Sequence, residues 1–364
     1  MFCLYNIFFG SEVAAVCAKS IKFAEKLLTM KKKILITAAA AVFVLLIAAV
    51  CLAPMRHYDG ADVRIYIPAG STADAVGDSL RSALGEAYGG EVYRCWLMLG
   101  GEAATAHGSY VVKSGAWSLR VARMVQSGRQ TPVRVHVGAA RLMGDVYARL
   151  ASKLEADSAS IARAIDSVAR QSGFTDKRWL PAAILPDTYE FYWTAKPERV
   201  AQTLLKVRND FWNEQRRAQA AALGLTPVQV ATVASIVEEE SAMADEYPVI
   251  ARLYLNRLAK GMPLQADPTV KYAVGDFTLR RITGRHLAVE SPYNTYKHEG
   301  LPPGPIRMTE RRTIDAVLTA PAHTYLYMCA KEDFSGRHNF ATTFAEHQAN
   351  ARRYQQELNR RGIH

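Results

Sequence analysis

The chain has 364 residues, a net charge of +11 and a hydrophobic fraction of 49%. That length allows about two domains with sizeable cores. The basic balance favours an anionic partner, which can be a nucleic acid, a lipid surface or an acidic polymer. Because the sequence contains no zinc-finger spacing, no aromatic RNA-binding strand and no dense basic helix, no nucleic-acid partner is expected.

An almost uninterrupted apolar run covers residues 34–53 and directly follows three lysines. A run of this length can cross a bilayer, and the lysines favour the cytoplasmic side. The sequence therefore predicts a single-pass anchor in the cell inner membrane, with residues 1–55 as cytoplasmic N-terminus and helix and the C-terminal bulk outside. A cleaved signal peptide is the alternative, and Cys51 weakly resembles a lipoprotein site. Met30 would make a natural start, so the translation of residues 1–29 stays open.

The hydrophobic pattern beyond the anchor predicts a mixed α+β protein. Alternation indicates short strands, and a period near 3.6 residues indicates helices. A proline-rich, loop-rich segment is expected after Gly261. The predicted strands are 63–67, 110–112, 133–137 and 325–328, and the predicted helical regions are 72–84, 118–125, 142–168, 204–223, 227–260 and 343–360.

The helix predicted to start at Thr226 has a capping-box sequence and ends in three consecutive glutamates. Glu240 lies four residues after Ile236 and continues the apolar stripe. A carboxyl group against apolar surface is disfavoured as an anion, so its pKa should rise toward the range useful to a general acid. Glu239 falls on the polar side and is expected to be solvated, with Glu238 between the two. The alternative is that all three form an ordinary solvated helix end.

Short motifs accompany this helix, in chain order, at residues 185–189, 234–242, 264–272, 291–296, 300–306 and 338–340. In this order they resemble the MltG-type (YceG-like) endolytic murein transglycosylases over about residues 60–355. The resemblance implies a LysM-like, glycan-binding subdomain at 56–130 and a mostly helical catalytic domain with irregular loops at 131–364. It departs from the family at Gly138-Ala139, where a Glu-Gly pair is usual. From the residues alone, a structural spacer would fit the first subdomain as well.

The implied activity is cleavage of the MurNAc–GlcNAc bond inside nascent peptidoglycan strands, which leaves a 1,6-anhydro end. The implied partners are peptidoglycan glycan strands and peptidoglycan synthases, and neither a cofactor nor a metal is expected. In the family the catalytic glutamate precedes a small hydroxyl residue, which here is Glu240 before Ser241. Glu238 and Ser241 are then supporting residues.

Sugar-binding groups are expected in the loops after Gly261. Tyrosine faces, amides and carboxylates suit sugar rings and hydroxyls, but buried tyrosines can equally be core residues, and an Asp before Pro can be a turn former. Both alternatives stay open. His338 and His347 lack a third partner for a zinc site, so ordinary loop histidines are expected. The predicted substrate-binding residues are Gln265, Asp267, Tyr293, Asn294 and Tyr296.

Two other functions remain compatible with the sequence. A muramidase would hydrolyse the same bond, although no second catalytic carboxylate is evident. A non-catalytic wall-binding protein would have no need of an acid on an apolar face, which argues against that alternative.

Overall fold

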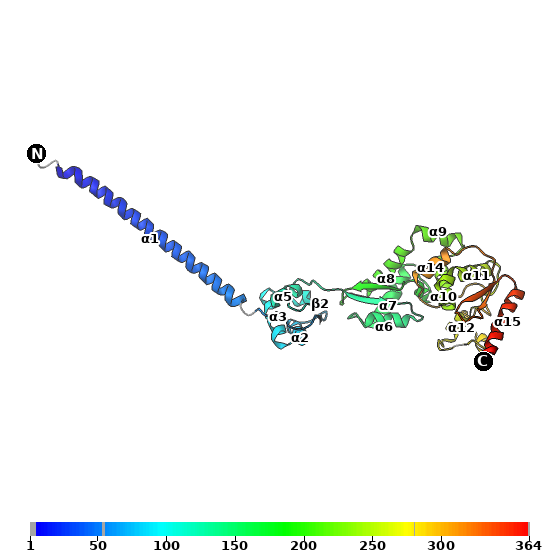
Figure 1. Cartoon of the computed structure of the whole chain (residues 1–364). Coiled ribbons are helices and arrows are strands. Elements are labelled where there is room, and N and C mark those ends of the chain that lie inside the picture. The colour runs from blue at the N-terminus through cyan, green and yellow to red at the C-terminus, as the bar shows by residue number, and fades with distance from the viewer. Residues whose placement is uncertain (1–4, 53–54, 280, 363–364) are drawn as a thin grey trace. The chain divides into compact units, whose positions relative to one another are not determined.

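The computed structural model describes residues 5–52, 55–279 and 281–362 (Figure 1). Its first element is the long helix α1 (Tyr5–Leu52). Within the described residues, no single helix combines the length and apolar character needed to cross a membrane. Only α9 (Glu214–Ala222) and α10 (Pro227–Glu240), bent by 77°, would together do so by length and composition. Ala53, the last residue of the predicted anchor, lies outside the described residues, and the anchor stays a prediction.

The chain divides into two compact units. The first unit contains the residues up to Ile65 together with Ala73–Thr105 and Val111–Ser127. The second contains Tyr66–Thr72, Ala106–Tyr110 and everything from Gly128 onward. Each unit is described by itself below, and the LysM-like identity of residues 56–130 stays a prediction.

The helices of the first unit pack closely. Gly89 of α3 lies so near α2 that a Cβ atom there would be 2.4 Å from the carbonyl oxygen of Leu80. Helix α3 was not predicted, because Gly85, Gly89 and Gly90 lower the helix propensity of this stretch. The elements in this part of the chain are β1 (Val63–Ile67), α2 (Ala73–Leu84), α3 (Glu86–Met98), α4 (Ala103–Ala106), β2 (Gly108–Val112) and α5 (Ser118–Gln126), with β1 and β2 in a two-stranded sheet.

The second unit starts with an antiparallel ribbon that carries a helical layer. Strands β3 (Val133–Val137) and β4 (Asp187–Phe191) pair with Val135 opposite Tyr189. Their buried side chains share one core with α6, α7 and α8. The helices concerned are α6 (Met143–Ala151), α7 (Ser158–Gln171) and α8 (Pro197–Phe211), and the 3-10 helix η1 (Lys177–Ala182) precedes β4.

Two helices that the sequence predicted as continuous are each interrupted. The predicted helix at 142–168 is α6 followed by α7, and the one at 204–223 overlaps α8 and α9. In both cases a polar residue caps the second helix: Asp157 accepts a hydrogen bond from the backbone N–H of Ser160 at 2.8 Å, and Asn213 accepts one from that of Arg216 at 2.9 Å. These caps satisfy N–H groups of a new helix start, which the hydrophobic period alone does not reveal.

Helix α10 runs through the centre of the second unit (Figure 1). The predicted capping box is confirmed, with Thr226 and Gln229 bonded to each other's backbone N–H groups. All eight residues from Val230 to Val237 are buried. The helix is therefore covered on every side, including the side on which Thr232 and Ser235 lie, rather than along one stripe.

Of the remaining elements, α11, α12 and α14 pack against α10. Helices α11 and α14 share its core, and α15 packs on the hairpin of β5 and β6, where Ala330 lies opposite His338. The predicted α+β class is confirmed. These elements are η2 (Ala244–Glu246), α11 (Tyr247–Ala259), α12 (Asp267–Val274), α13 (Gly284–Leu287), α14 (Arg311–Leu318), β5 (Tyr327–Ala330), β6 (His338–Ala341) and α15 (Phe344–Arg360).

Candidate active site

The carboxyl group of Glu240 lies at the end of α10 and faces α11. The buried Tyr254 of α11 donates a hydrogen bond from its hydroxyl to Oε1 of Glu240 at 2.5 Å. Burial raises the pKa of Glu240 to about 7, and the negative charge of Asp267 acts in the same direction. The Tyr254 hydrogen bond opposes this rise in pKa, as do the charges of Lys271 and Arg257. Near neutral pH, a large fraction of Glu240 therefore carries a proton that it can donate.

Glu240 lines a polar pocket of about 290 Å³. The walls come from α10, α11, the loop before α12, the start of α12, the loop after α13 and the β5–β6 hairpin. Three of the predicted site residues, Gln265, Asp267 and Tyr296, lie in this same wall. The full lining is Glu240, Leu253, Tyr254, Arg257, Leu264, Gln265, Asp267, Tyr296, Met328, Cys329, Ala330 and His338.

Asp267 is the first residue of α12 and brings a second carboxylate into the pocket. The hydroxyl of Tyr296 donates to its Oδ1 at 2.7 Å. A second carboxylate thus shares the pocket with Glu240, although the two residues are 27 positions apart in the sequence. Burial and the hydrogen bond to Asp267 raise the pKa of Tyr296, so its hydroxyl stays a donor.

Gln265 adopts a left-handed backbone conformation with φ of 52°. Such a conformation is uncommon for a residue with a side chain and marks a position held by its surroundings. Here the backbone N–H of Gln265 donates to the carbonyl of Thr295 at 3.1 Å, and its side-chain oxygen accepts from Arg257 at 3.2 Å. The amide of Gln265 is therefore fixed at the pocket wall.

Arg257 organises the loop on this side of the pocket. Its buried guanidinium donates to the carbonyl of Leu264 at 2.9 Å and to that of Leu326, before β5, at 2.6 Å. Sequence reasoning missed Arg257 and Tyr254, since neither stands out from the helical pattern of α11. Both residues are buried, and their polar groups bond to segments outside α11, which the pattern of one helix does not show.

Two of the predicted sugar-binding residues do not line the pocket. Asn294 is fully buried, and its amide donates to the carbonyls of Leu287 and Val289 at 2.9 Å while its oxygen accepts from the N–H of Tyr296 at 3.1 Å. The structure therefore does not bring Asn294 to the pocket with Gln265, Asp267 and Tyr296, and its predicted contact with a sugar stays a prediction. Tyr293 packs in the core, 4.7 Å from the ring of Tyr272 between centroids, as the core-packing alternative expected.

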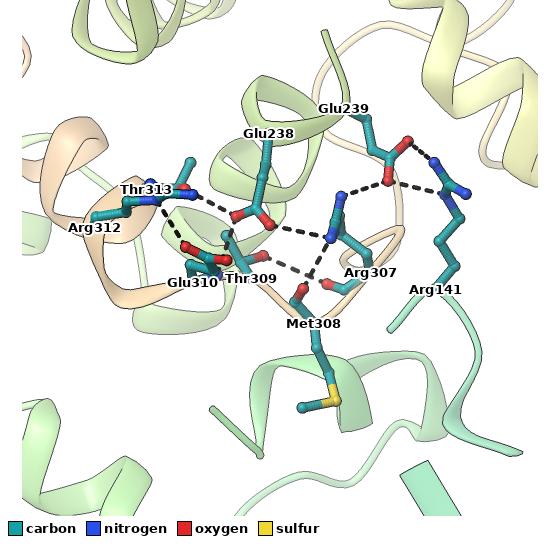
Figure 2. A network of polar contacts seen from close by, with 9 residues as sticks. All are labelled: Arg141, Glu238, Glu239, Arg307, Met308, Thr309, Glu310, Arg312 and Thr313. Carbon is teal, nitrogen blue, oxygen red and sulfur yellow. Dashed lines mark hydrogen bonds and ion pairs between the residues drawn. The ribbon is translucent and has the colours of Figure 1, made fainter. Parts of the chain in front are cut away.

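Glu239 is not solvated, contrary to its prediction. Figure 2 shows its carboxylate between two arginines, with Arg141 bound through two hydrogen bonds of 2.9 and 2.7 Å and Arg307 at 2.7 Å. Only 12% of the Glu239 side chain is exposed. The side of α10 that appears polar is covered by the segment before α14, where the N–H of Ile306 donates to Ser235.

Glu238 is a structural carboxylate in the same network. It accepts hydrogen bonds from the backbone N–H of Glu310 at 3.0 Å and the hydroxyl of Thr313 at 2.8 Å, and it pairs with Arg307 at 3.2 Å (Figure 2). Burial raises its pKa, while these partners act in the opposite direction. Glu238 thereby ties the end of α10 to the start of α14, which fits the supporting role predicted for it.

Ser241 ends α10 and connects it to a further carboxylate. Its hydroxyl donates to Oε2 of the buried Glu246 at 3.0 Å and accepts from the N–H of Met243 at 3.0 Å. Glu246 in turn holds His338, which lines the pocket. His338, expected in a loop, thus belongs to strand β6 and is part of the pocket wall.

Comparison with known proteins shows the family to which this chain belongs. A sequence model of the YceG-like family matches residues 65–353. The chain belongs to the YceG-like family. A structure of a yceG-like protein from Listeria monocytogenes has 23% sequence identity and a TM-score of 0.53, and the match covers 79% of this chain and 98% of that one, which shows the shared fold.

Two relatives found by sequence comparison are named as enzymes. The endolytic murein transglycosylase of Bacillus subtilis (strain 168) is 34% identical over 179 residues, which is 49% of this chain and 49% of that protein. The protein of the same name from Streptococcus pneumoniae (strain D39) is 32% identical over 130 residues, 35% of this chain and 23% of that protein. The chain thus matches about half the length of the first relative and less of the second.

Proposed function

We propose that this chain is an endolytic peptidoglycan lytic transglycosylase with Glu240 as its catalytic residue. The observation that carries the proposal is a carboxyl group with its pKa raised to about 7, at the wall of a polar pocket that also holds a carboxylate, an amide and tyrosine hydroxyls. Such a group is poised to give up a proton and take one back near neutral pH. The names of the curated relatives support the same reaction.

In the proposed reaction the Glu240 carboxyl protonates the oxygen between MurNAc C1 and GlcNAc. The C1–O bond breaks, and positive charge develops on the muramyl ring. The 6-hydroxyl of the same MurNAc attacks C1, its proton passes to the Glu240 carboxylate, and a 1,6-anhydro end forms. No water is consumed, and Glu240 returns to its starting protonation state.

Asp267 favours a second candidate function on the same bond. A muramidase uses two carboxylates, one as acid and the other as nucleophile or base, and Asp267 shares the pocket with Glu240. In the lytic reaction Asp267 instead stabilises the positive charge that develops on the sugar ring and accepts hydrogen bonds, with Tyr296 bonded to one of its oxygens.

The ends of the products distinguish these functions. The purified full-length chain is incubated with uncrosslinked glycan strands, and the fragments are analysed by mass spectrometry. Anhydro ends on internal fragments support an endolytic lytic transglycosylase, reducing ends support a muramidase, and no cleavage supports a non-catalytic binding protein. In the Asp267→Asn variant we expect anhydro ends to persist at a reduced rate, whereas a muramidase would lose its reducing-end product.

We further propose that α1 anchors the protein in the cytoplasmic membrane and that peptidoglycan synthases supply its nascent strands. The apolar side chains of Ile34, Leu35, Ile36 and Leu45 are more than 60% exposed, next to Lys31–Lys33. Fractionation should recover the full-length chain with the inner membrane. A mature N-terminus beyond Cys51 together with soluble periplasmic protein would overturn the anchor.

A further inference from the structure

His338 is held by the buried Glu246 through two hydrogen bonds. The backbone N–H of His338 donates to Oε1 of Glu246 at 2.9 Å, and Nδ1 lies 2.9 Å from Oε2. Only 8% of the Glu246 side chain and 15% of the His338 side chain are exposed. A histidine ring fixed in this way at a pocket wall has one nitrogen left for a ligand.

The partners of Glu246 determine which ring nitrogen carries the proton. The Ser241 hydroxyl accepts from the N–H of Met243, so its own proton is directed at Oε2 of Glu246. Oε2 is then an acceptor for Nδ1 as well, and Nδ1 carries the hydrogen. In neutral His338 the nitrogen Nε2 is therefore unprotonated, and it has no hydrogen-bond partner among residues 5–52, 55–279 and 281–362.

The same carboxylate also links His338 to the end of the helix that carries Glu240. Ser241 directly follows Glu240, and Glu246 binds Ser241 and His338 at once. Glu240 and His338 line one pocket. A ligand that reaches the acid of Glu240 therefore meets an imidazole acceptor in a fixed position.

We propose that His338 is a substrate-binding residue whose Nε2 accepts a hydrogen bond from a hydroxyl group of the sugar bound beside Glu240, with Glu246 fixing its tautomer. The inference rests on the proposed function, because it takes a glycan as the ligand. A sugar hydroxyl suits this position because it donates to an unprotonated nitrogen. Glu246 is a positioning residue that acts through His338.

Two amide substitutions of His338 test the roles of its two ring nitrogens one at a time. His338→Asn places an amide nitrogen near Nδ1 and can keep the bond to Glu246, but it leaves nothing at Nε2. His338→Gln places its amide near Nε2 and gives up the bond to Glu246. Affinity for uncrosslinked glycan strands is measured in full-length protein carrying Glu240→Gln, where no cleavage disturbs the equilibrium, and thermal melting checks the fold of each variant.

We expect His338→Asn to weaken glycan binding about fivefold, the equivalent of one neutral hydrogen bond of about 1 kcal/mol, and His338→Gln to weaken it less than twofold. In the active protein, the Asn variant should raise KM with little change in kcat. If Asn preserves affinity while Gln loses it, His338 acts only through Glu246 and the proposal is wrong.

Two further outcomes keep the inference separate from the proposed function. Absence of cleavage by the wild-type chain would overturn the proposed function, whereas the binding comparison would still decide the role of His338. Should His338→Asn fail to fold, Glu246→Gln replaces it. This variant removes an acceptor of Nδ1–H and should raise KM in the same way, and an unchanged KM would contradict the proposal.

Discussion

At the C-terminal end of α10, Glu239 and Glu240 are neighbours in sequence, but they lie in opposite electrostatic environments. Glu239 lies between Arg141 and Arg307 and is bound as an anion (Figure 2). Glu240 lies in the pocket, where burial raises its pKa to about 7. A helix that is buried on all sides offers a different neighbour to each residue of its last turn. The chemistry of a carboxylate is therefore set by the segment that packs against it, not by its place in an acidic run.

The largest expected effect comes from removing the Glu240 carboxyl. Glu240→Gln is nearly isosteric and takes away the proton donor, so cleavage should fall by about 10²–10⁴-fold, the range of general acid–base catalysis. The measurement is the count of anhydro ends formed by the full-length variant from uncrosslinked glycan. Near-normal product from Glu240→Gln would mean that the acid is another residue.

Removing the Glu238 carboxylate should instead affect stability. Glu238→Gln weakens the pairing with Arg307 and leaves one of the donors from Glu310 and Thr313 poorly matched. Breaking a mostly buried ion pair costs about 3 kcal/mol, so the midpoint of urea unfolding should fall. At temperatures where the variant is folded, its rate per molecule should stay within about threefold of wild type. A thousandfold loss of rate in a folded Glu238→Gln protein would place this residue in the chemistry.

A smaller effect is expected from Tyr254→Phe. The hydroxyl of Tyr254 lowers the pKa of Glu240 by binding its carboxylate, so the loss of this hydroxyl should raise that pKa further. Cleavage needs the protonated acid. The fall of kcat/KM with rising pH, expected near pH 7 in the wild type, should therefore shift upward in the variant. A downward shift, or none, would show that Tyr254 does not control the acid.

The features of the site that depend on local sequence patterns could be predicted from the sequence. The capping box at Thr226, the burial of the apolar stripe of α10 and the place of Glu240 on that stripe all follow from residues within one helix. Gln265, Asp267 and Tyr296 were expected from their side-chain types in the loops after Gly261, and the structure brings them to the pocket. Helix breaks at Asp157 and Asn213 were missed because a cap does not disturb the hydrophobic period.

The rest of the site depends on contacts between distant segments. Glu239 was expected in solvent because no local signal shows that Arg141, 98 residues earlier, and Arg307 would cover it. Asn294 has a side chain of a type that binds sugars, but its amide donates to the backbone carbonyls of Leu287 and Val289. The ring of His338 is held by Glu246, 92 residues away. Such contacts join segments that are far apart in the sequence, so residue type and spacing do not predict them.

The raised pKa of Glu240 also has a consequence for stability. Its pKa in the folded protein, about 7, lies above 4.5, the ordinary value for a glutamate. The contribution of Glu240 to the free energy of unfolding is therefore greatest below pH 4.5. It falls by up to about 3 kcal/mol as the pH rises through 7. Glu240→Gln removes this loss, so the variant should melt at a higher temperature than the wild type at pH 8 and show little advantage at pH 4.5. A wild type as stable as the variant at pH 8 would contradict the raised pKa.

The protonation of Glu240 can be measured directly by infrared spectroscopy of the carbonyl stretch of protonated carboxyl groups. The full-length wild type, Glu240→Gln and the matched control Glu239→Gln are titrated from pH 4 to pH 9. We predict one carboxyl that loses its proton with a midpoint near pH 7, present in the wild type and in Glu239→Gln and absent from Glu240→Gln. A midpoint near 4.5, or a signal that disappears with Glu239 instead, would contradict the assignment of Glu240 as the acid.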